Sequence, residues 1–279
     1  MNYCIKGNTI EISDNEDFVP AHILECGQIF SYERVGDASQ DRWLVFSADK
    51  KAEIVPNGDR FKILTDDTKY FENFFDLQTD YSSLKKKLSK FEILKEPIKF
   101  GHGIRILKQN LFETLISFIV SANNNIKRIQ LILGRLREQL GTNMGDFRAF
   151  PTQKQMLAVD ENFFKEIGAG YRAPYLYKVV RQVDENTLQD WQTLPTRELR
   201  NKLISLAGVG PKVADCVLLF GFGRGDVFPV DTWIHQMYNK FYAPLENREK
   251  IRANLTKEFG QNSGYAQQYL FFFIRSGEK

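Results

Sequence analysis

Cysteine and histidine are scarce in this chain, which has three of each among its 279 residues. The cysteines are too few for a disulfide framework, and none belongs to a Cys-x-x-Cys pair or a Cys/His spacing typical of metal ligands. The sequence therefore predicts neither a structural zinc nor an iron–sulfur cluster, and no metal site. The three histidines match no catalytic pattern, and we assign them no role; they are His22, His102 and His235.

Long apolar runs are also missing. No stretch reaches the roughly 18–20 apolar residues that a membrane-spanning helix needs. The first residues, MNYCIKGNTIEISDNED, are polar and acidic, unlike the basic and apolar segments of a signal peptide. We therefore expect a cytoplasmic protein without membrane contact. The 43% of hydrophobic residues is enough for a packed core and excludes a wholly disordered chain.

Charge is nearly balanced overall, with a net charge of +3, but it is unevenly distributed. Residues 1–100 contain 14 Lys and Arg against 18 Asp and Glu, whereas residues 101–279 contain 24 against 17. A basic C-terminal part beside an acidic N-terminal part is compatible with a polyanionic partner for the former. The same asymmetry is also compatible with an ordinary solvated surface.

The spacing of apolar residues changes along the chain and predicts an α+β protein. RWLVFSAD and KAEIVPNGDRFKILTDD are rich in strand formers, and a hairpin turn is expected at Asn57–Asp59. Helical spacing begins near residue 105. We therefore expect a mixed α/β domain at 1–100, built on an antiparallel sheet, and an all-helical region at 101–279. Helices are expected over 160–167, 173–186, 195–206, 211–222, 232–243, 246–259 and 264–275.

The segment LISLAGVGPKVADC, residues 203–216, is the most informative. Gly208 and Gly210 bracket one apolar residue, Val209, and a helix can start at Pro211. Such a turn directs backbone amides and a helix N-terminus outward, which is a grip for phosphate. The alternative is an ordinary corner between two helices with a glycine cap.

Lys212 favours the first of these interpretations. It occupies the first turn of a helix, where the macrodipole disfavours positive charge and so favours a free amine. A free lysine amine is a nucleophile that forms Schiff bases. Cys216 lies at i+4 on the same helical face. Asp231, in PVDTW, is expected to cap the next helix, and its carboxylate could also stabilise a cationic sugar.

These residues resemble the helix-hairpin-helix, Gly/Pro-rich, Asp superfamily of DNA glycosylases. Four further stretches resemble the 8-oxoguanine DNA glycosylase branch: CGQIF (26–30), FIVSANNNIKRI (118–129), GAGYRAPYL (168–176) and GYAQQYLF (264–271). The resemblance implies a monomeric bacterial or archaeal base-excision enzyme without cofactor, acting on double-stranded DNA of the nucleoid. It also implies two helical subdomains that flank an active-site cleft.

The resemblance implies roles for individual residues. Lys212 would attack the sugar C1′ of 8-oxoguanine opposite cytosine, with β-elimination to follow, and Asp231 would support the cation. The flipped base would meet Gly27, Cys216, Gln267 and Phe271. The vacated stack and the estranged base would meet Asn123, Arg128, Tyr171 and Arg172. Backbone groups of Gly208, Gly210 and Val213 would hold phosphate, and the carbonyls near Ile204, Leu206 and Val209 could hold a monovalent cation.

Two positions depart from the branch. Trp233 stands where eukaryotic members carry a histidine, and Ile274 stands where they carry an acidic residue. Two alternatives remain at this point: a glycosylase for another lesion, and a non-catalytic damage-binding protein that keeps only the hairpin. Gln267 and CGQIF disfavour the first alternative. The pairing of Lys212 with Asp231 disfavours the second, because gripping a backbone needs neither residue.

Overall fold

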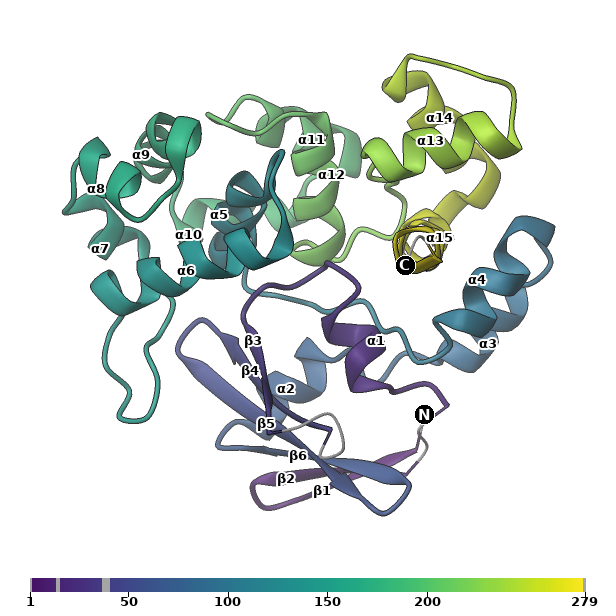
Figure 1. Cartoon of the computed structure of the whole chain (residues 1–279), viewed down its shortest axis with the longest axis horizontal. Helices are drawn as coiled ribbons and strands as arrows, with labels where there is room; N and C mark the ends of the chain where they lie inside the picture. Colours follow the sequence, from purple (N-terminus) through teal and green to yellow (C-terminus); the bar gives the residue numbers. More distant parts are fainter. Residues whose placement is uncertain (1, 14–15, 37–40, 278–279) are drawn as a thin grey trace.

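A six-stranded antiparallel sheet forms one end of the molecule, as the computed structural model shows for the residues it describes, 2–13, 16–36 and 41–277 (Figure 1). The spatial order is β1-β2-β6-β5-β4-β3. The hairpin predicted at Asn57–Asp59 is confirmed, because Asn57 pairs with Arg60 and Gly58 has a φ of +67°. The strands are β1 (Tyr3–Lys6), β2 (Thr9–Ile12), β3 (Tyr32–Val35), β4 (Arg42–Ser47), β5 (Lys50–Asn57) and β6 (Arg60–Thr65).

One face of the sheet is buried under two short helices, α1 (Pro20–Leu24) and α2 (Thr68–Phe74). The register places Trp43 opposite Ile54, and Ile54 opposite Ile63, so all three point to the same face. All three are fully buried. The alternation of apolar and polar residues in these strands therefore determines which face carries the helices.

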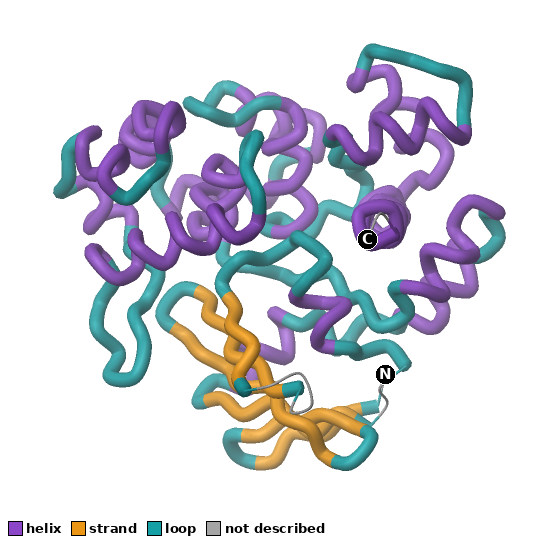
Figure 2. The backbone as a smooth tube through the Cα atoms, viewed as in Figure 1, coloured by secondary structure: helices purple, strands orange, loops and turns teal. Residues whose placement is uncertain are grey.

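Thirteen further α-helices of the described chain form two groups beyond the sheet (Figures 1 and 2). The first group surrounds α5, which is buried along almost its whole length. It consists of α5 (Leu111–Ser121), α6 (Ile126–Leu140), α7 (Gln153–Leu157), α8 (Glu161–Glu166), α9 (Ala173–Gln182), α10 (Glu185–Asp190), α11 (Thr196–Ile204) and α12 (Pro211–Phe220).

The second group surrounds α15 and combines two segments that are far apart in the sequence. It consists of α3 (Tyr81–Leu88), α4 (Lys95–Phe100), α13 (Thr232–Phe241), α14 (Arg248–Phe259) and α15 (Ser263–Gly277). Tyr81 and Ile98 share its core with Phe228 and Tyr269. Residues on both sides of position 100 therefore stabilise the same unit.

The single helix expected over 173–186 is wrong. Helix α9 ends at Gln182, Val183 is extended, and α10 starts two residues later. The cause is Asp184, whose side chain accepts a hydrogen bond from the Thr187 amide at 2.8 Å and caps the new helix.

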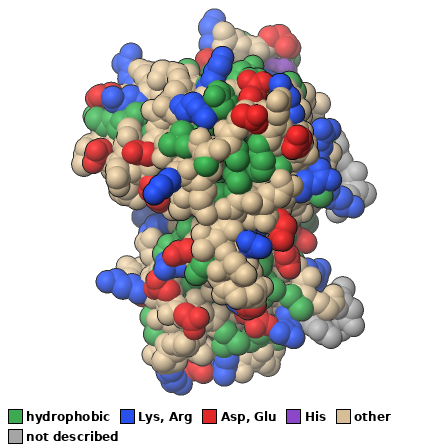
Figure 3. Space-filling view, turned by 90° about the vertical axis from the view of Figure 1, so that its left-hand side faces the viewer, with side chains coloured by type: hydrophobic (Ala, Val, Ile, Leu, Met, Phe, Trp, Pro, Cys, Tyr) green, Lys and Arg blue, Asp and Glu red, His purple; other side chains and the backbone are tan. Residues whose placement is uncertain are grey.

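None of the helices in the described part of the chain combines the length and the apolarity needed to cross a membrane. On the face drawn in Figure 3, basic and acidic side chains are interspersed, and neither sign forms one large patch. The charge asymmetry of the sequence therefore produces no single-sign surface on that face.

Candidate active site

The turn between α11 and α12 depends on its two glycines. Gly208 has a φ of +79°, and a Cβ there would lie 2.7 Å from the Cβ of Tyr175, so only glycine fits. Gly210 is the N-cap of α12, and nothing lies within 4 Å of the position its Cβ would take. Val209 is buried between the helices. The turn thus packs closely against Tyr175 at Gly208, whereas the space beside Gly210 is open.

Lys212 is the second residue of α12, at the edge of the first helical group. Its Nζ lies 5.3 Å from the ring centroid of Phe118 on α5. Burial raises the pKa of the neighbouring Cys216 thiol to about 11, the nearby Lys212 amine opposes this shift, and Asp231 adds to it. Lys212 and Asp231 therefore both lie within electrostatic reach of Cys216.

Asp231 caps α13, as predicted. Its Oδ1 accepts a hydrogen bond from the Ile234 amide at 2.9 Å. This bond fixes the carboxylate at the start of a helix that belongs to the second group, whereas Lys212 starts a helix of the first group. The two residues therefore lie near the starts of helices that belong to different groups.

The turn at Gly27 packs against α15. Gly27 has a φ of +84°, and a Cβ there would lie 3.1 Å from Cε1 of Phe271 and 2.9 Å from Nη1 of Arg275. Gln268 Nε2 donates to the Cys26 carbonyl at 2.8 Å, which ties the turn to the same helix. Gln267 is 5% exposed, and its Oε1 has no hydrogen-bond partner in the described residues. A buried amide oxygen without a partner is costly unless a ligand satisfies it.

Aromatic contacts connect this turn to Lys212. Phe30, three residues after Gly27, packs edge-on against Phe118 with ring centroids 5.6 Å apart. Phe118 in turn contacts the Lys212 amine. Two aromatic rings therefore connect the segment of the Gly27 turn to the hairpin lysine, which lies 185 residues later in the sequence (212 − 27).

A third cluster lies at the turn between α5 and α6. Asn123 has a φ of +49°, which is strained for a residue other than glycine. Arg172 holds this turn, since its Nε donates to the Ala122 carbonyl at 2.8 Å and its Nη2 to the Asn123 carbonyl at 2.8 Å. Tyr171 is 55% exposed, and its hydroxyl also donates to the Ala122 carbonyl.

Arg172, which the resemblance assigns to the estranged base, is buried. It is only 4% exposed, and its guanidinium lies 4.4 Å from the ring centroid of Tyr171. Burial lowers the pKa of Arg172, and the charge of nearby Arg128 lowers it further. Arg128 itself lies in the exposed first turn of α6. Asn123, Arg128, Tyr171 and Arg172 are thus brought together, with Arg172 already bonded to the backbone.

Comparison with known families identifies the chain. Residues 9–115 match the N-terminal domain of 8-oxoguanine DNA glycosylases, and residues 116–261 match the HhH-GPD superfamily. The chain belongs to the HhH-GPD superfamily of base excision DNA repair proteins. The resemblance to its 8-oxoguanine branch is confirmed by the first of these matches.

Individual relatives of this superfamily cover most of the chain. A probable N-glycosylase/DNA lyase of Methanothermobacter thermautotrophicus is 30% identical, over 74% of this chain and 72% of its own. The Clostridium acetobutylicum 8-oxoguanine glycosylase/lyase, solved with double-stranded DNA containing cytosine opposite 8-oxoguanine, is 33% identical with a TM-score of 0.91. The alignment covers 100% of this chain and 99% of that one. MBOgg1, solved with a low-affinity DNA ligand, has the same identity, TM-score and coverage.

Sequence reasoning missed three residues that contact the candidate site: Phe30, Phe118 and Arg275. Phe30 and Phe118 lie inside the signature stretches, but only their contact shows that they join the Gly27 turn to Lys212. The sequence did contain a signal that could have identified Arg275. It follows Phe271 by four residues and Gln267 by eight, so all three share one face of a helix.

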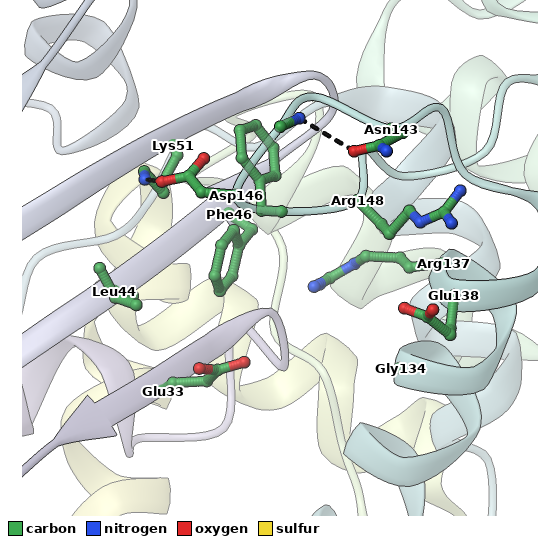
Figure 4. A pocket seen from close by; sticks show the side chains of 12 residues that line it. Glu33, Leu44, Phe46, Lys51, Gly134, Arg137, Glu138, Asn143, Asp146 and Arg148 are labelled. Carbon is green, nitrogen blue, oxygen red and sulfur yellow. Dashed lines mark hydrogen bonds and ion pairs between the residues drawn. The ribbon is translucent and has the colours of Figure 1, made fainter.

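A separate pocket of about 500 Å³ opens between the sheet and α6 (Figure 4). The side chain of Arg137 extends toward it beside Phe46, and pairs with the buried Glu113 at 3.9 Å. None of the predicted site residues lines this pocket. Within residues 2–13, 16–36 and 41–277, no cluster of three or more His, Cys, Asp or Glu side chains could hold a metal ion.

Proposed function

We propose that this protein is a bifunctional DNA N-glycosylase and apurinic/apyrimidinic-site lyase that excises 8-oxoguanine opposite cytosine. The observation that carries the proposal is that Lys212 and Asp231 both lie within electrostatic reach of Cys216, next to the glycine hairpin. The rings of Phe30 and Phe118 connect Lys212 to the Gly27 turn. The Clostridium acetobutylicum enzyme, solved with this lesion pair, supports it through similarity over the whole chain.

The proposed chemistry begins with the flipped nucleotide, because an enzyme that acts on a base must take it out of the stack. The Lys212 amine forms a bond to C1′, the bond from C1′ to the base nitrogen breaks, and the base leaves with that electron pair. The Asp231 carboxylate stabilises the positive charge that develops on the sugar. Ring opening gives a Schiff base with Lys212, from which β-elimination breaks the 3′ carbon–oxygen bond of the strand.

Lesion selectivity is assigned to the turn at residue 27. Oxidation converts N7 of guanine from a hydrogen-bond acceptor into an N–H donor. The Gly27 carbonyl can accept a hydrogen bond from that donor. Ordinary guanine would place two lone pairs against each other, so the cost falls on the undamaged base. Gln267, with its buried and unpartnered Oε1, would bond the Watson–Crick edge. Cys216 and Phe271 would cover the two faces of the ring.

The third cluster would serve the opposite strand. Exposed Tyr171 would act as a wedge, and Asn123 would occupy the space left by the flipped nucleotide. Arg128 and Arg172 would donate to the acceptor edge of the estranged cytosine. Because Arg172 already donates hydrogen bonds to three carbonyls, its contribution requires sharing or exchanging those bonds, whereas Arg128 is exposed and can bind directly.

Duplex binding would rest on the hairpin backbone at Gly208, Gly210 and Val213, independent of sequence. Phosphate contacts of this kind make affinity strongly salt-dependent and favour residence on the nucleoid. We further infer that the protein acts as a monomer. With DNA bound, the carbonyls of Ile204, Leu206 and Val209 would hold a monovalent cation.

Borohydride trapping tests the proposal. The protein would be incubated with duplexes that carry 8-oxoguanine opposite each of the four bases. We expect a covalent adduct that forms best opposite cytosine, and its loss in Lys212→Gln but not in Lys95→Gln, an exposed lysine on α4. Lys212→Gln should still bind the lesion duplex. Excision without an adduct would contradict the role of Lys212. Binding without excision would favour a damage sensor, and an adduct only with other damaged bases would favour a different lesion.

A further inference from the structure

Helix α15 places a positively charged side chain, that of Arg275, at the edge of the proposed lesion pocket. Gln267, Phe271 and Arg275 follow one another at intervals of four residues and lie along one face of this helix. The proposed function uses the first two and leaves Arg275 without a role. A charged side chain aligned with two base-reading residues is a candidate for a part in recognition.

Arg275 contacts both the stacking ring and the turn. Its Nη2 donates to the carbonyl of Glu25, and its guanidinium carbon lies 5.2 Å from the ring centroid of Phe271. Its Nη1 lies 2.9 Å from the position that a Cβ on residue 27 would occupy. One guanidinium thus joins the Gly27 turn to the phenyl ring that faces it.

The charge of Arg275 also reaches the turn. Burial raises the pKa of the Cys26 thiol to about 11, and the guanidinium of Arg275 is the strongest influence in the opposite direction. Cys26 precedes Gly27 directly, so this field acts on the peptide groups that would read the lesion. A guanidinium on the face of a phenyl ring is itself an attractive pair that restrains the ring.

The turn needs such a restraint. Gly27 adopts a left-handed conformation and, as a glycine, has wide access to others. Discrimination between N7–H and a bare N7 requires its carbonyl to stay at hydrogen-bond distance, since the energy of such a bond falls steeply with geometry. The bond from Gln268 to the Cys26 carbonyl restrains the turn at a second point, so removal of Arg275 should loosen the turn without unfolding it.

We propose that Arg275 is a positioning residue for lesion discrimination, which fastens the Gly27 turn to Phe271 so that the carbonyl meets N7–H of the flipped base. This inference rests on the proposed function. It predicts that loss of Arg275 impairs the excision of the base but spares the later lyase step, because an abasic site has no base to read.

The test compares two substrates of one protein. Single-turnover excision would be measured on an 8-oxoguanine:cytosine duplex, and strand nicking on the same duplex with a preformed abasic site. Arg275→Met should lower the excision rate constant by about tenfold or more, since a charge-assisted hydrogen bond is lost, and leave nicking within about twofold. Arg275→Lys, which keeps the charge and can still donate a hydrogen bond, should recover part of the excision rate. Arg60→Met, on the distant β5–β6 hairpin, is the matched control.

The possible results distinguish a failure of the role proposed for Arg275 from a failure of the proposed function. Equal losses on both substrates would mean a general structural role and would overturn the inference, as would unchanged excision in Arg275→Met. Wild-type protein that processes neither substrate would overturn the proposed function together with the inference. A selective loss of excision with partial rescue by lysine would establish the positioning role.

Discussion

The buried carboxylate of Asp215 offers the sharpest prediction about stability. It is 1% exposed and lies on α12, three residues after Lys212. Arg200 of α11 donates to its Oδ1 at 2.7 Å, and Arg252 of α14 donates to its Oδ2 at 2.9 Å. Arg200 also pairs with Glu249 at 2.9 Å. One carboxylate therefore ties the helix of Lys212 to the group of helices that positions Asp231.

The expected magnitude follows from what each arginine loses in Asp215→Asn. Removal of one partner of a buried ion pair typically costs about 3–5 kcal/mol, because the remaining charge is left uncompensated. Arg200 keeps its pair with Glu249, whereas Arg252 loses its charged partner while its side chain is only 19% exposed. We therefore expect a loss near the lower limit, about 3 kcal/mol in the free energy of unfolding.

Urea unfolding followed by circular dichroism would measure this loss. Glu249→Gln is the matched control, since that side chain is 50% exposed and such pairs contribute about 0–1 kcal/mol. In a double-mutant cycle, Arg252→Met should cost much less in the Asp215→Asn background than in the wild type. The reasoning would be refuted if Asp215→Asn and Glu249→Gln had equally small effects on the free energy of unfolding. It would also be refuted if the effects of Asp215→Asn and Arg252→Met were additive.

Four further predictions concern the site and the cysteines. Gly208→Ala places a Cβ 2.7 Å from Tyr175 at a φ of +79°, so it should cost at least about 2 kcal/mol in urea unfolding and weaken binding to undamaged duplex. Arg172→Met removes the hydrogen bonds that hold the turn at Asn123, so it should lower stability by about 2–3 kcal/mol and reduce the preference for cytosine in excision assays. Burial raises the pKa values of the Cys26 and Cys216 thiols to about 11, whereas Cys4 is exposed. A reagent that reacts with thiolates should therefore modify one cysteine of the folded chain at pH 8, and all three cysteines in urea. Because both folded-state pKa values lie above the model-peptide value of about 9, the thiols stabilise the fold fully below pH 9, and this contribution to the free energy of unfolding should fall as the pH rises toward 11.

Local signals predicted local structure well. The hairpin at Asn57–Asp59, the cap at Asp231 and the turn at Gly208 each depend on a few neighbouring residues, and each is present in the structure. The helix expected over 173–186 failed for an equally local reason, since Asp184 competes for the backbone by capping a new helix. That side chain was visible in the sequence.

Long-range packing was not predictable in this way. The shared core of Tyr81 and Tyr269, the burial of Arg172 against the carbonyls of Ala122 and Asn123, and the contact of Arg275 with Gly27 join segments far apart in the chain. Propensity and periodicity describe neighbours within a few residues, so they carry no information on which distant faces meet.

The sequence by itself predicted the chemical groups of the candidate site: a lysine at a hairpin, an aspartate at the start of a later helix, and a glycine turn that resembles the 8-oxoguanine branch. Residue type and close spacing suffice for that, because nucleophilicity, capping and turn conformation are local properties. Only the tertiary structure decided how these parts meet. Lys212 and Asp231 lie on helices that pack into different hydrophobic cores, and the position of the Gly27 turn depends on contacts with α15. Burial and close packing across the whole chain therefore set the positions of these three residues relative to one another.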